Sequence, residues 1–239
     1  LTFRYGLPQQ WDVEVAVPWR HYSGGVTDNL ISSWHRLFGL PDGNRHGYPT
    51  DALHYQLSQP EHDRHLLRSV SGLGDIYVAV SRPLLAIDGG QLGISAGVKT
   101  ASGRASDWLG SGATDIYALL RFSGQQPGGR PLWLHGQVGV TRAGDSNLFG
   151  PHQRRSLWFA GLAAEWRFTP RWSALMQYDG HGALLDGALE AVGEPAGMLS
   201  MAVRWRPAGH WMIDAGFSED VVVESAPDIT VLLTVRYVP

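Results

Sequence analysis

The chain has 239 residues, a formal net charge of −3, 44% hydrophobic and 17% charged residues, 30 glycines, 10 tryptophans and no cysteine. The small net charge gives no reason to expect a nucleic-acid partner, and the lack of cysteine excludes disulfides and thiolate metal sites. No segment approaches the ~18 consecutive apolar residues of a membrane-spanning helix. The length fits one all-β domain, and low charge with many glycines and tryptophans is typical of a transmembrane β-barrel.

Side chains alternate with a period of two along residues 157–168, which is the periodicity of a β-strand. One face carries Trp158, Ala160, Leu162, Ala164, Trp166 and Phe168, and the other carries Phe159, Gly161, Ala163, Glu165 and Arg167. The pattern recurs at 11–19, 115–122, 199–206, 211–218 and 229–237, and more weakly at 1–6, 75–86, 90–100, 131–142 and 171–180. The sequence therefore predicts eleven strands.

Connections between these strands are alternately short and long, as in outer-membrane barrels with short periplasmic turns and long extracellular loops. Residues 6–10, 86–90 and 169–171 are short connections, and 22–73, 101–112 and 143–155 are long ones. We expect an antiparallel up-and-down barrel in a single domain, residues 1–239, with 22–73 as a long extracellular loop. Single-chain barrels usually have an even number of strands. We therefore expect about twelve, with the first strand and any export signal preceding this sequence; alternatively, residues 50–70 supply the additional strand.

Large aromatic residues flank the short connections and share the parity of the apolar faces. This predicted girdle at the periplasmic interface comprises Trp11, Trp166, Trp172, Trp205, Trp211 and Tyr237. Trp19, Trp158 and Tyr178 lie near the opposite strand ends and suggest a second girdle. A soluble β-sandwich is the alternative, but it would not place its aromatics selectively beside short turns.

Charged residues occupy the other parity, so a barrel would direct them into its lumen. The predicted lumen-lining residues are Asp12, Glu14, Lys99, Asp115, Arg121, Glu165, Arg167, Asp179, Arg204, Arg206, Asp214 and Arg236. In a narrow lumen these charges must be paired or hydrated. They form either a closed salt-bridge network that stiffens the wall or the lining of a narrow polar channel. Both signs occur in similar number, so we expect no strong ion selectivity.

The segment 26–38 within the long loop has apolar residues at helical spacing. Asp28 can cap the start of this helix, and Gly39 followed by Leu40 and Pro41 ends it. Its apolar stripe comprises Leu30, Ile31, Trp34, Leu37 and Phe38. Because burying one such side chain is worth roughly 1.5–3 kcal/mol, we expect this mouth helix to pack across the extracellular mouth and to narrow or close it.

Three segments carry a resemblance to a known family: HYSGGVTDNLISSWHRLFGLPDGNR (21–45), SGLGDIYVAV (71–80) and GVKTASG with GSGATDIYALL (97–103, 110–120). They resemble proteobacterial outer-membrane β-barrels of uncharacterised function. The resemblance extends through residue 123 and implies the barrel fold and an outer-membrane location in a Gram-negative bacterium. It implies no activity.

A second, local resemblance covers residues 21–38 and is to outer-membrane phospholipase A. In that family a His and a Ser two residues apart face the lipid, and an Asn follows a downstream Trp. The matching residues are His21, Ser23 and His35, and a neutral imidazole beside a hydroxyl can activate Ser as a nucleophile. This chain departs from that pattern at two positions, because His35 stands at the Asn position and Ile31 at the position of a hydroxyl residue.

We therefore expect a porin-like narrow channel or binding barrel for a small solute, with outer-membrane lipid as its surroundings. A lipid-directed serine hydrolase and a structural or partner-binding barrel are the alternatives. We favour a non-enzymatic role, and we expect neither a cofactor nor a metal ion.

Overall fold

A computed structural model describes residues 1–41, 47, 49–59, 62–126, 131–186, 193–207, 209–222 and 230–238, and these residues form an all-β fold. The main sheet consists of β1 (Thr2–Gly6), β2 (Asp12–Ala16), β7 (Tyr77–Ile87), β8 (Gly90–Lys99), β9 (Asp115–Gln125), β10 (Leu132–Arg142), β11 (Ser156–Arg167), β12 (Trp172–His181), β13 (Ala196–Trp205), β14 (Trp211–Val222) and β15 (Thr230–Tyr237). Every pair of neighbours in it is antiparallel. The eleven predicted strands are confirmed.

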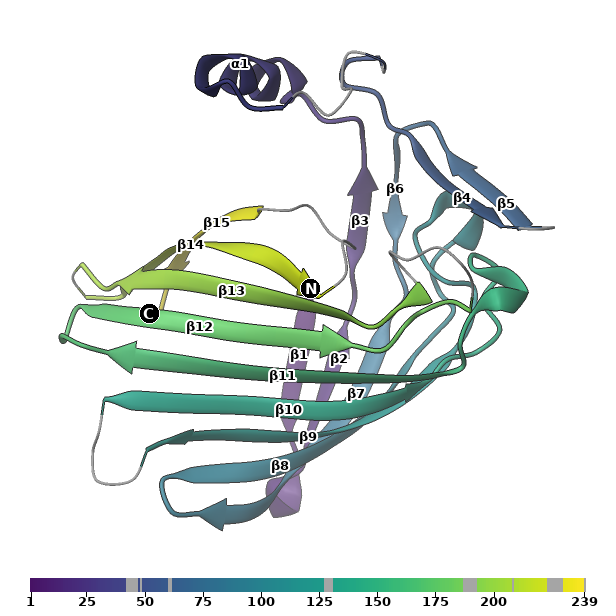
Figure 1. The fold of residues 1–239 in the computed structure, drawn as a ribbon. Coiled ribbons are helices and arrows are strands. Elements are labelled where there is room, and N and C mark those ends of the chain that lie inside the picture. The colour runs from purple at the N-terminus through teal and green to yellow at the C-terminus, as the bar shows by residue number, and fades with distance from the viewer. Residues whose placement is uncertain are drawn as a thin grey trace.

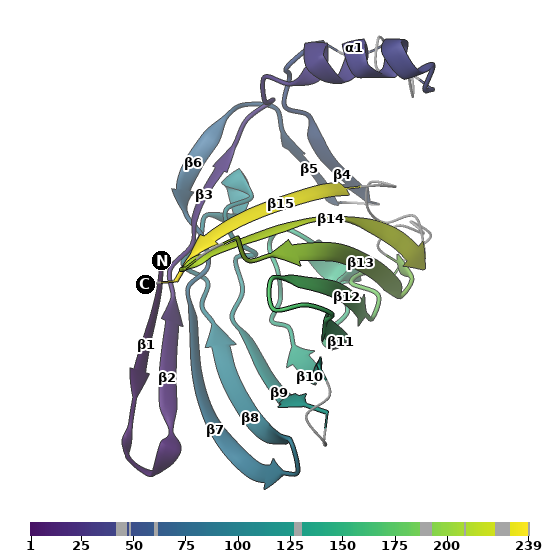
Figure 2. The same ribbon diagram turned by 90° about the vertical axis from the view of Figure 1, so that its left-hand side faces the viewer.

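The main sheet is strongly curved (Figures 1 and 2). Strand order follows chain order from β1 to β15, as an up-and-down barrel requires. No ladder joins β1 to β15 among the described residues. Eleven antiparallel strands leave the first and last strands parallel to each other, whereas a twelfth strand would restore alternation around a closed barrel. Closure and the twelfth strand stay predictions.

The predicted strand over 11–19 is interrupted at Pro18, which has no N–H to donate to a ladder. Before the break, β2 pairs with β7 in the main sheet. After it, β3 (Trp19–Tyr22) pairs instead with β6 (Val70–Leu73) in a two-stranded ribbon. The Pro18 carbonyl still accepts a hydrogen bond from Gly74 N–H at 2.8 Å. The ribbon leads away from the main sheet toward α1 (Figure 2).

The segment 22–73 contains more regular structure than a plain loop. It holds helix α1 (Asp28–Phe38) and a hairpin of β4 (Tyr55–Gln59) and β5 (His62–Leu66). Strands within 50–70 therefore exist, but they form a separate sheet and add nothing to the main one. Short 3₁₀ turns occur at Pro8–Gln10, Ala105–Asp107 and Gly150–His152.

A small apolar core lies where the ribbon and the hairpin meet the loop after β8. Leu66, Val70 and Leu109 are buried together, and Tyr22 and Trp108 pack against them. The Tyr22 hydroxyl also donates to the Trp108 carbonyl at 3.1 Å. This cluster fixes the base of the segment that carries α1.

The two faces of the main sheet differ in composition. We call the face that carries Trp166 the outer face and the face that carries Glu165 the inner face. Large apolar side chains on the outer face are exposed, Trp166 by 55% for example. The inner face carries polar side chains that are mostly less exposed. In the part of the chain that the structure describes, no helix is both long and apolar enough to cross a membrane.

Trp205→Ala tests the outer face. Trp205 stacks on Trp172 with ring centroids 5.7 Å apart and an interplanar angle of 16°. Because the substitution removes this contact and apolar area, we expect the free energy of unfolding in lipid vesicles to fall by about 1–3 kcal/mol. Ser200→Ala, on the same strand but the inner face, should change it by less than about 0.5 kcal/mol. Equal losses in urea titrations of the two variants would contradict the assignment of faces.

Candidate functional site

Charged side chains from four strands gather on the inner face beside the turn at 168–171. We call this group the arginine cluster; its members are Arg167, Arg204, Arg206, Arg236, Glu165 and Asp214. They come from β11, β13, β14 and β15 and from the residue that follows β13. All six belong to the set predicted to line a lumen, and the structure brings them together.

Arg204 holds the centre of the cluster, because each of its guanidinium nitrogens donates to a carboxylate. Nε and Nη2 donate to Asp214 Oδ1 and Oδ2 at 2.7 and 2.8 Å, and Nη1 donates to Glu165 Oε2 at 2.8 Å. Arg206 donates to the second oxygen of Glu165 at 2.6 Å and to Ser173 Oγ at 2.8 Å. Ser173 has no exposed surface and donates to Glu165 as well. Charge-assisted bonds of this kind offset the cost of burying both carboxylates.

Two arginines of the cluster, Arg167 and Arg236, make fewer polar contacts than Arg204 and Arg206. The Arg167 Nη2 lies 3.8 Å from Glu165 Oε1, and its Nε is buried with no hydrogen-bond partner among the described residues. Its guanidinium lies over the Trp133 ring, with Cζ 4.4 Å from the ring centroid. The Arg236 side chain makes no hydrogen bond or ion pair within the described part of the chain, although its charge acts on Asp214. The cluster therefore contains donors that its own carboxylates do not occupy.

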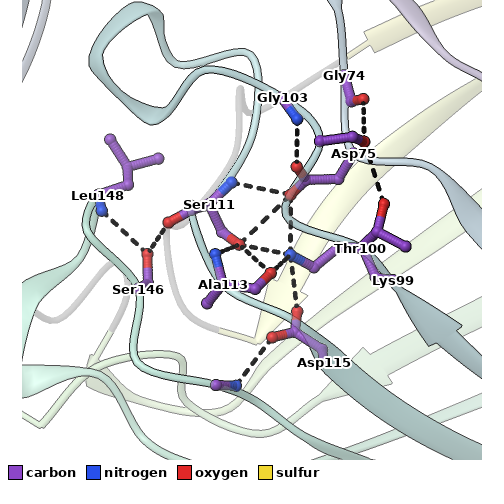
Figure 3. A network of polar contacts seen from close by, with 12 residues as sticks. Gly74, Asp75, Lys99, Thr100, Gly103, Ser111, Ala113, Asp115, Ser146 and Leu148 are labelled. Atoms are coloured by element: carbon purple, nitrogen blue, oxygen red, sulfur yellow. Dashed lines mark hydrogen bonds and ion pairs between the residues drawn. The ribbon is translucent and has the colours of Figure 1, made fainter.

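A second polar group, which we call the lysine network, lies at the end of the sheet opposite the arginine cluster. It consists of Asp75 before β7, Lys99 at the end of β8, Asp115 at the start of β9, and Ser111 (Figure 3). Lys99 is only 6% exposed. Its Nζ donates to Asp75 Oδ2 and to the Ala113 carbonyl, each at 2.8 Å, and also to Ser111 Oγ. Asp115 Oδ2 lies 3.2 Å from the same nitrogen. Two carboxylates thus share one buried ammonium group.

The carboxylates of the lysine network also bind loop backbone. The N–H groups of Gly103 and Ser111 donate to Asp75, and that of Gly144 donates to Asp115, each at 2.9 Å. Connections that are far apart in sequence are thereby held to one point (Figure 3). Their polar groups are satisfied internally, so the network supports the loops and leaves Lys99 unavailable to a solute.

Asp75 was missed by the sequence analysis. The structure begins β7 at Tyr77, so Asp75 precedes the strand, but it shares the inward parity of Tyr77, which lies opposite Lys99. A signal was nevertheless present. Asp75 and Asp115 each begin an Asp-Ile-Tyr triplet, at 75–77 and 115–117. Lys99 lies on the strand between these triplets, opposite Tyr77 on one side and Asp115 on the other. The repeated triplet therefore marks the two carboxylates that meet Lys99. Trp133 and Ser173 were also missed, although both have inward parity.

Asp75 lies outside the strands of the main sheet, and its surroundings shift the pKa of its carboxyl. Burial acts to raise the pKa of this carboxyl. Hydrogen bonds from Lys99 and from the N–H groups of Ser111 and Gly103 outweigh burial, together with the Lys99 charge, so the pKa lies below its ordinary value. Asp75 is therefore ionised in the folded protein at neutral pH.

The remaining residues predicted to line a lumen lie on the inner face but outside both groups. Arg4 donates to both oxygens of Asp12 at 2.9 Å. Gln177 donates to Asp179 at 2.5 Å. The side chains of Glu14 and Arg121 form no hydrogen bond or ion pair with any other described residue. The predicted set is thus divided into separate groups along the sheet.

The mouth helix forms as predicted, but it does not pack across the sheet. Leu30, Trp34, Leu37 and Phe38 are all exposed, Leu37 by 76%, and Ile31 is half-buried. The helix stands well away from the main sheet in both views (Figures 1 and 2). The expectation of a packed, occluding helix is corrected on this point.

The reason lies on the polar side of α1. Asp28 accepts a hydrogen bond from Asp51 N–H at 2.7 Å, which holds the helix against the segment after it. A cleft of about 950 Å³ separates the two and is lined by Asp28, Ser32, Ser33, Arg36, Thr50, His54 and neighbouring residues. The polar side of the helix therefore faces its own loop, and the apolar stripe is directed outward.

The residues of the predicted hydrolase site do not come together. His21 Nδ1 lies 2.6 Å from Ser71 Oγ on the paired strand β6, and not within hydrogen-bond reach of Ser23. Ser23 Oγ instead accepts a weak hydrogen bond from Gly25 N–H at 3.4 Å. His35 is bonded to the Pro41 carbonyl at the end of α1. A nucleophile–base pair between His21 and Ser23 is absent from the described structure.

Members of the predicted girdle lie on the outer face, close to short turns. Trp166, Trp172, Trp205, Trp211 and Tyr237 are exposed there, whereas Trp11 is half-buried. Arg82 Cζ lies 5.6 Å from the centroid of the Trp11 ring, which explains that burial. Among the described residues, no group of three or more His, Asp or Glu side chains is arranged to hold a metal ion.

Comparison with known proteins places this architecture in a family. The family described as "Protein of unknown function (DUF3187)" matches residues 1–238. The chain belongs to this family. No match was found among curated protein sequences. Among solved structures, the chain is similar to the crystal structure of a Pseudomonas aeruginosa FadL homologue, with a TM-score of 0.46 and 12% identity. The similarity covers 92% of this chain but spans only 58% of that protein. The predicted membership of an uncharacterised family is confirmed.

Lys99→Met tests the lysine network of this DUF3187 protein. The substitution leaves the buried Asp75 and the half-buried Asp115 without their cation, so the free energy of unfolding should fall by about 3–5 kcal/mol. Arg154→Met is the control, because it breaks an exposed ion pair with Asp186 and should cost less than about 1 kcal/mol. Denaturant titrations of both variants measure the difference, and a small loss in Lys99→Met would contradict the proposed support of the loops.

The depressed pKa of Asp75 predicts an acid-sensitive contribution to stability. A carboxyl whose folded pKa lies below its unfolded value of about 3.9 stabilises the protein above that value. This stabilisation is lost as the pH falls through the folded pKa. Comparing unfolding midpoints at several pH values between 7 and 2 should show a larger decline in the native chain than in Asp75→Asn. Parallel declines would show that Asp75 does not contribute.

Proposed function

We propose that this chain is a single outer-membrane barrel domain, residues 1–239, whose inner face forms a narrow polar passage or binding site for a small solute. The segment 22–73 would lie on the extracellular side, and the turns beside the arginine cluster would lie on the periplasmic side. The observation that carries the proposal is the separation of side chains between the two faces of one sheet.

The outer face supports contact with lipid. Between β11 and β14 it contains a hollow of about 410 Å³ whose walls include Trp166, Met176, Met201, Val203 and Phe217. Such a surface fits acyl chains, and the exposed aromatic side chains near the turns suit the headgroup region. An arginine on a lipid-facing wall costs ~2–4 kcal/mol at mid-bilayer, which agrees with the inward placement of the arginine cluster.

The inner face supports water and solute. Many of its charges lie in the arginine cluster and the lysine network, at the two ends of the sheet. Other charged residues, such as Arg121 and Asp179, and polar groups such as His135 and Gln177 lie outside these two groups. Charged groups are stable in such a space when they are paired or hydrated. Spare donors in the arginine cluster favour a passage over a wall that is closed throughout.

The structural barrel remains a second candidate because of one observation. Arg204, Glu165 and Asp214 saturate one another, as expected of a salt bridge that stiffens a wall. A passage and a stiffened wall differ in whether a group on the inner face is reached by solutes from water. That difference can be measured directly.

Two adjacent residues of β11 give a matched test. Ala163 lies on the inner face opposite Gln177, and Ala164 lies on the outer face opposite Met176. The chain has no cysteine, so Ala163→Cys and Ala164→Cys each introduce a single reactive thiol. In planar bilayers, a charged methanethiosulfonate reagent should reduce the conductance of Ala163→Cys and leave Ala164→Cys unchanged.

The outcomes separate the candidate functions. Conductance that falls only in Ala163→Cys supports a passage along the inner face. A protein that inserts but conducts no ions supports the structural barrel. Reaction of Ala164→Cys in the bilayer, with Ala163→Cys inert, would reverse the assignment of faces and overturn the proposal.

A further inference from the structure

The arginine cluster carries more positive than negative charge. Its four arginines face two carboxylates, Glu165 and Asp214, on the same face of the sheet. The predicted lumen-lining set as a whole contains equal numbers of both signs, from which no strong selectivity was expected. The structure shows that the signs are unevenly distributed, because the excess of arginine is confined to one end of β11 and β13–β15.

Geometry separates arginines that hold the cluster together from arginines that remain available. Every guanidinium nitrogen of Arg204 donates to a carboxylate, and Arg206 donates hydrogen bonds to Glu165 and Ser173. The side chain of Arg167 is 38% exposed, and its only charge contact with a described residue is the long one to Glu165. Arg236 is exposed and forms no ion pair with any described residue. Available donors therefore lie on either side of a fixed frame.

Trp133 prepares Arg167 for recognition of an anion. Stacking on the indole ring holds the plane of the guanidinium and shields one of its faces, and because Nε is buried, the Nη groups are left to donate. The edge of a guanidinium carries paired N–H donors whose spacing matches two oxygens of a carboxylate or phosphate. Because this pair of donors matches two oxygens, it favours oxyanions over halide ions of the same charge, and its fixed orientation lowers the side-chain entropy lost on binding.

We infer that the arginine cluster is a binding site for small oxyanions, with Arg167 and Arg236 as the ligand-contacting residues and Arg204 as a positioning residue. The inference rests on the proposed passage and specifies its solute class as anionic. Solutes with a carboxylate or phosphate group would be attracted to the cluster, and small cations would be disfavoured at the same position.

Reversal potentials in planar bilayers test the inference. Under a potassium acetate gradient, the native chain should pass acetate about threefold more readily than potassium, as expected for two spare charges acting through water. Arg167→Gln combined with Arg236→Gln should bring this ratio to 1 or below. Arg82→Gln is the matched control, because Arg82 lies on Trp11 at the outer face and should leave the ratio unchanged. A native ratio of 1 or below, with ions still conducted, would overturn the anion site and leave the proposed passage intact.

Fluorescence quenching tests the anion site without requiring that the protein conduct ions. Iodide and caesium ions quench tryptophan fluorescence on contact. The fluorescence of the native chain minus that of Trp133→Phe gives the signal of Trp133, the ring that Arg167 covers. With each ion's quenching divided by its quenching of free tryptophan, iodide should quench this signal more strongly than caesium, and the Arg167→Gln/Arg236→Gln variant should lose the difference. Added acetate should protect Trp133 from iodide in the native chain. Equal quenching by both ions in the native chain would exclude an anion site, whether or not the barrel conducts.

Discussion

Successive side chains on a strand point to opposite sides, and this geometric constraint governs most of the structure. Each strand of the curved sheet must serve two environments at once, so every second residue is chosen for one of them. On β11, Glu165 and Arg167 occupy one side while Trp166 between them occupies the other. Neither environment could be satisfied by a run of one residue type. The charge groups, the exposed aromatic residues and the apolar hollow all follow from this alternation.

The alternation is local, which is why the sequence predicts the strands so well. Each of the eleven strands of the main sheet is visible within about ten residues, and the helix at Asp28–Phe38 shows its own period just as clearly. The break at Pro18 was less visible, because the apolar pattern continues from Val17 to Trp19 across it. A single missing N–H sends the chain into a different sheet there, although the periodicity is unchanged.

Partners across the sheet could not be predicted, because they depend on which strand ends meet in space. The parity of Arg204 predicts that its side chain lies on the inner face. It does not predict that Asp214 and Glu165 accept its hydrogen bonds. The apolar stripe of α1 likewise shows which of its residues avoid water but not what covers them. The decisive contact, between Asp28 and the backbone of Asp51, joins residues 23 positions apart and lies on the other side of the helix. Asp75 was missed for a related reason, because its partners Lys99, Gly103 and Ser111 lie 24 to 36 residues further along the chain.

The lysine network has a consequence for how the sheet is assembled. Sliding one strand past its neighbour by a single residue would exchange its two sides, and little in an alternating sequence of small residues such as β8 opposes this. Lys99 at the end of β8 binds Asp75, which precedes β7, and Asp115, which begins β9. A slip of β8 in either direction would separate the ammonium group from at least one carboxylate. One buried lysine thereby sets the alignment of three neighbouring strands, β7, β8 and β9.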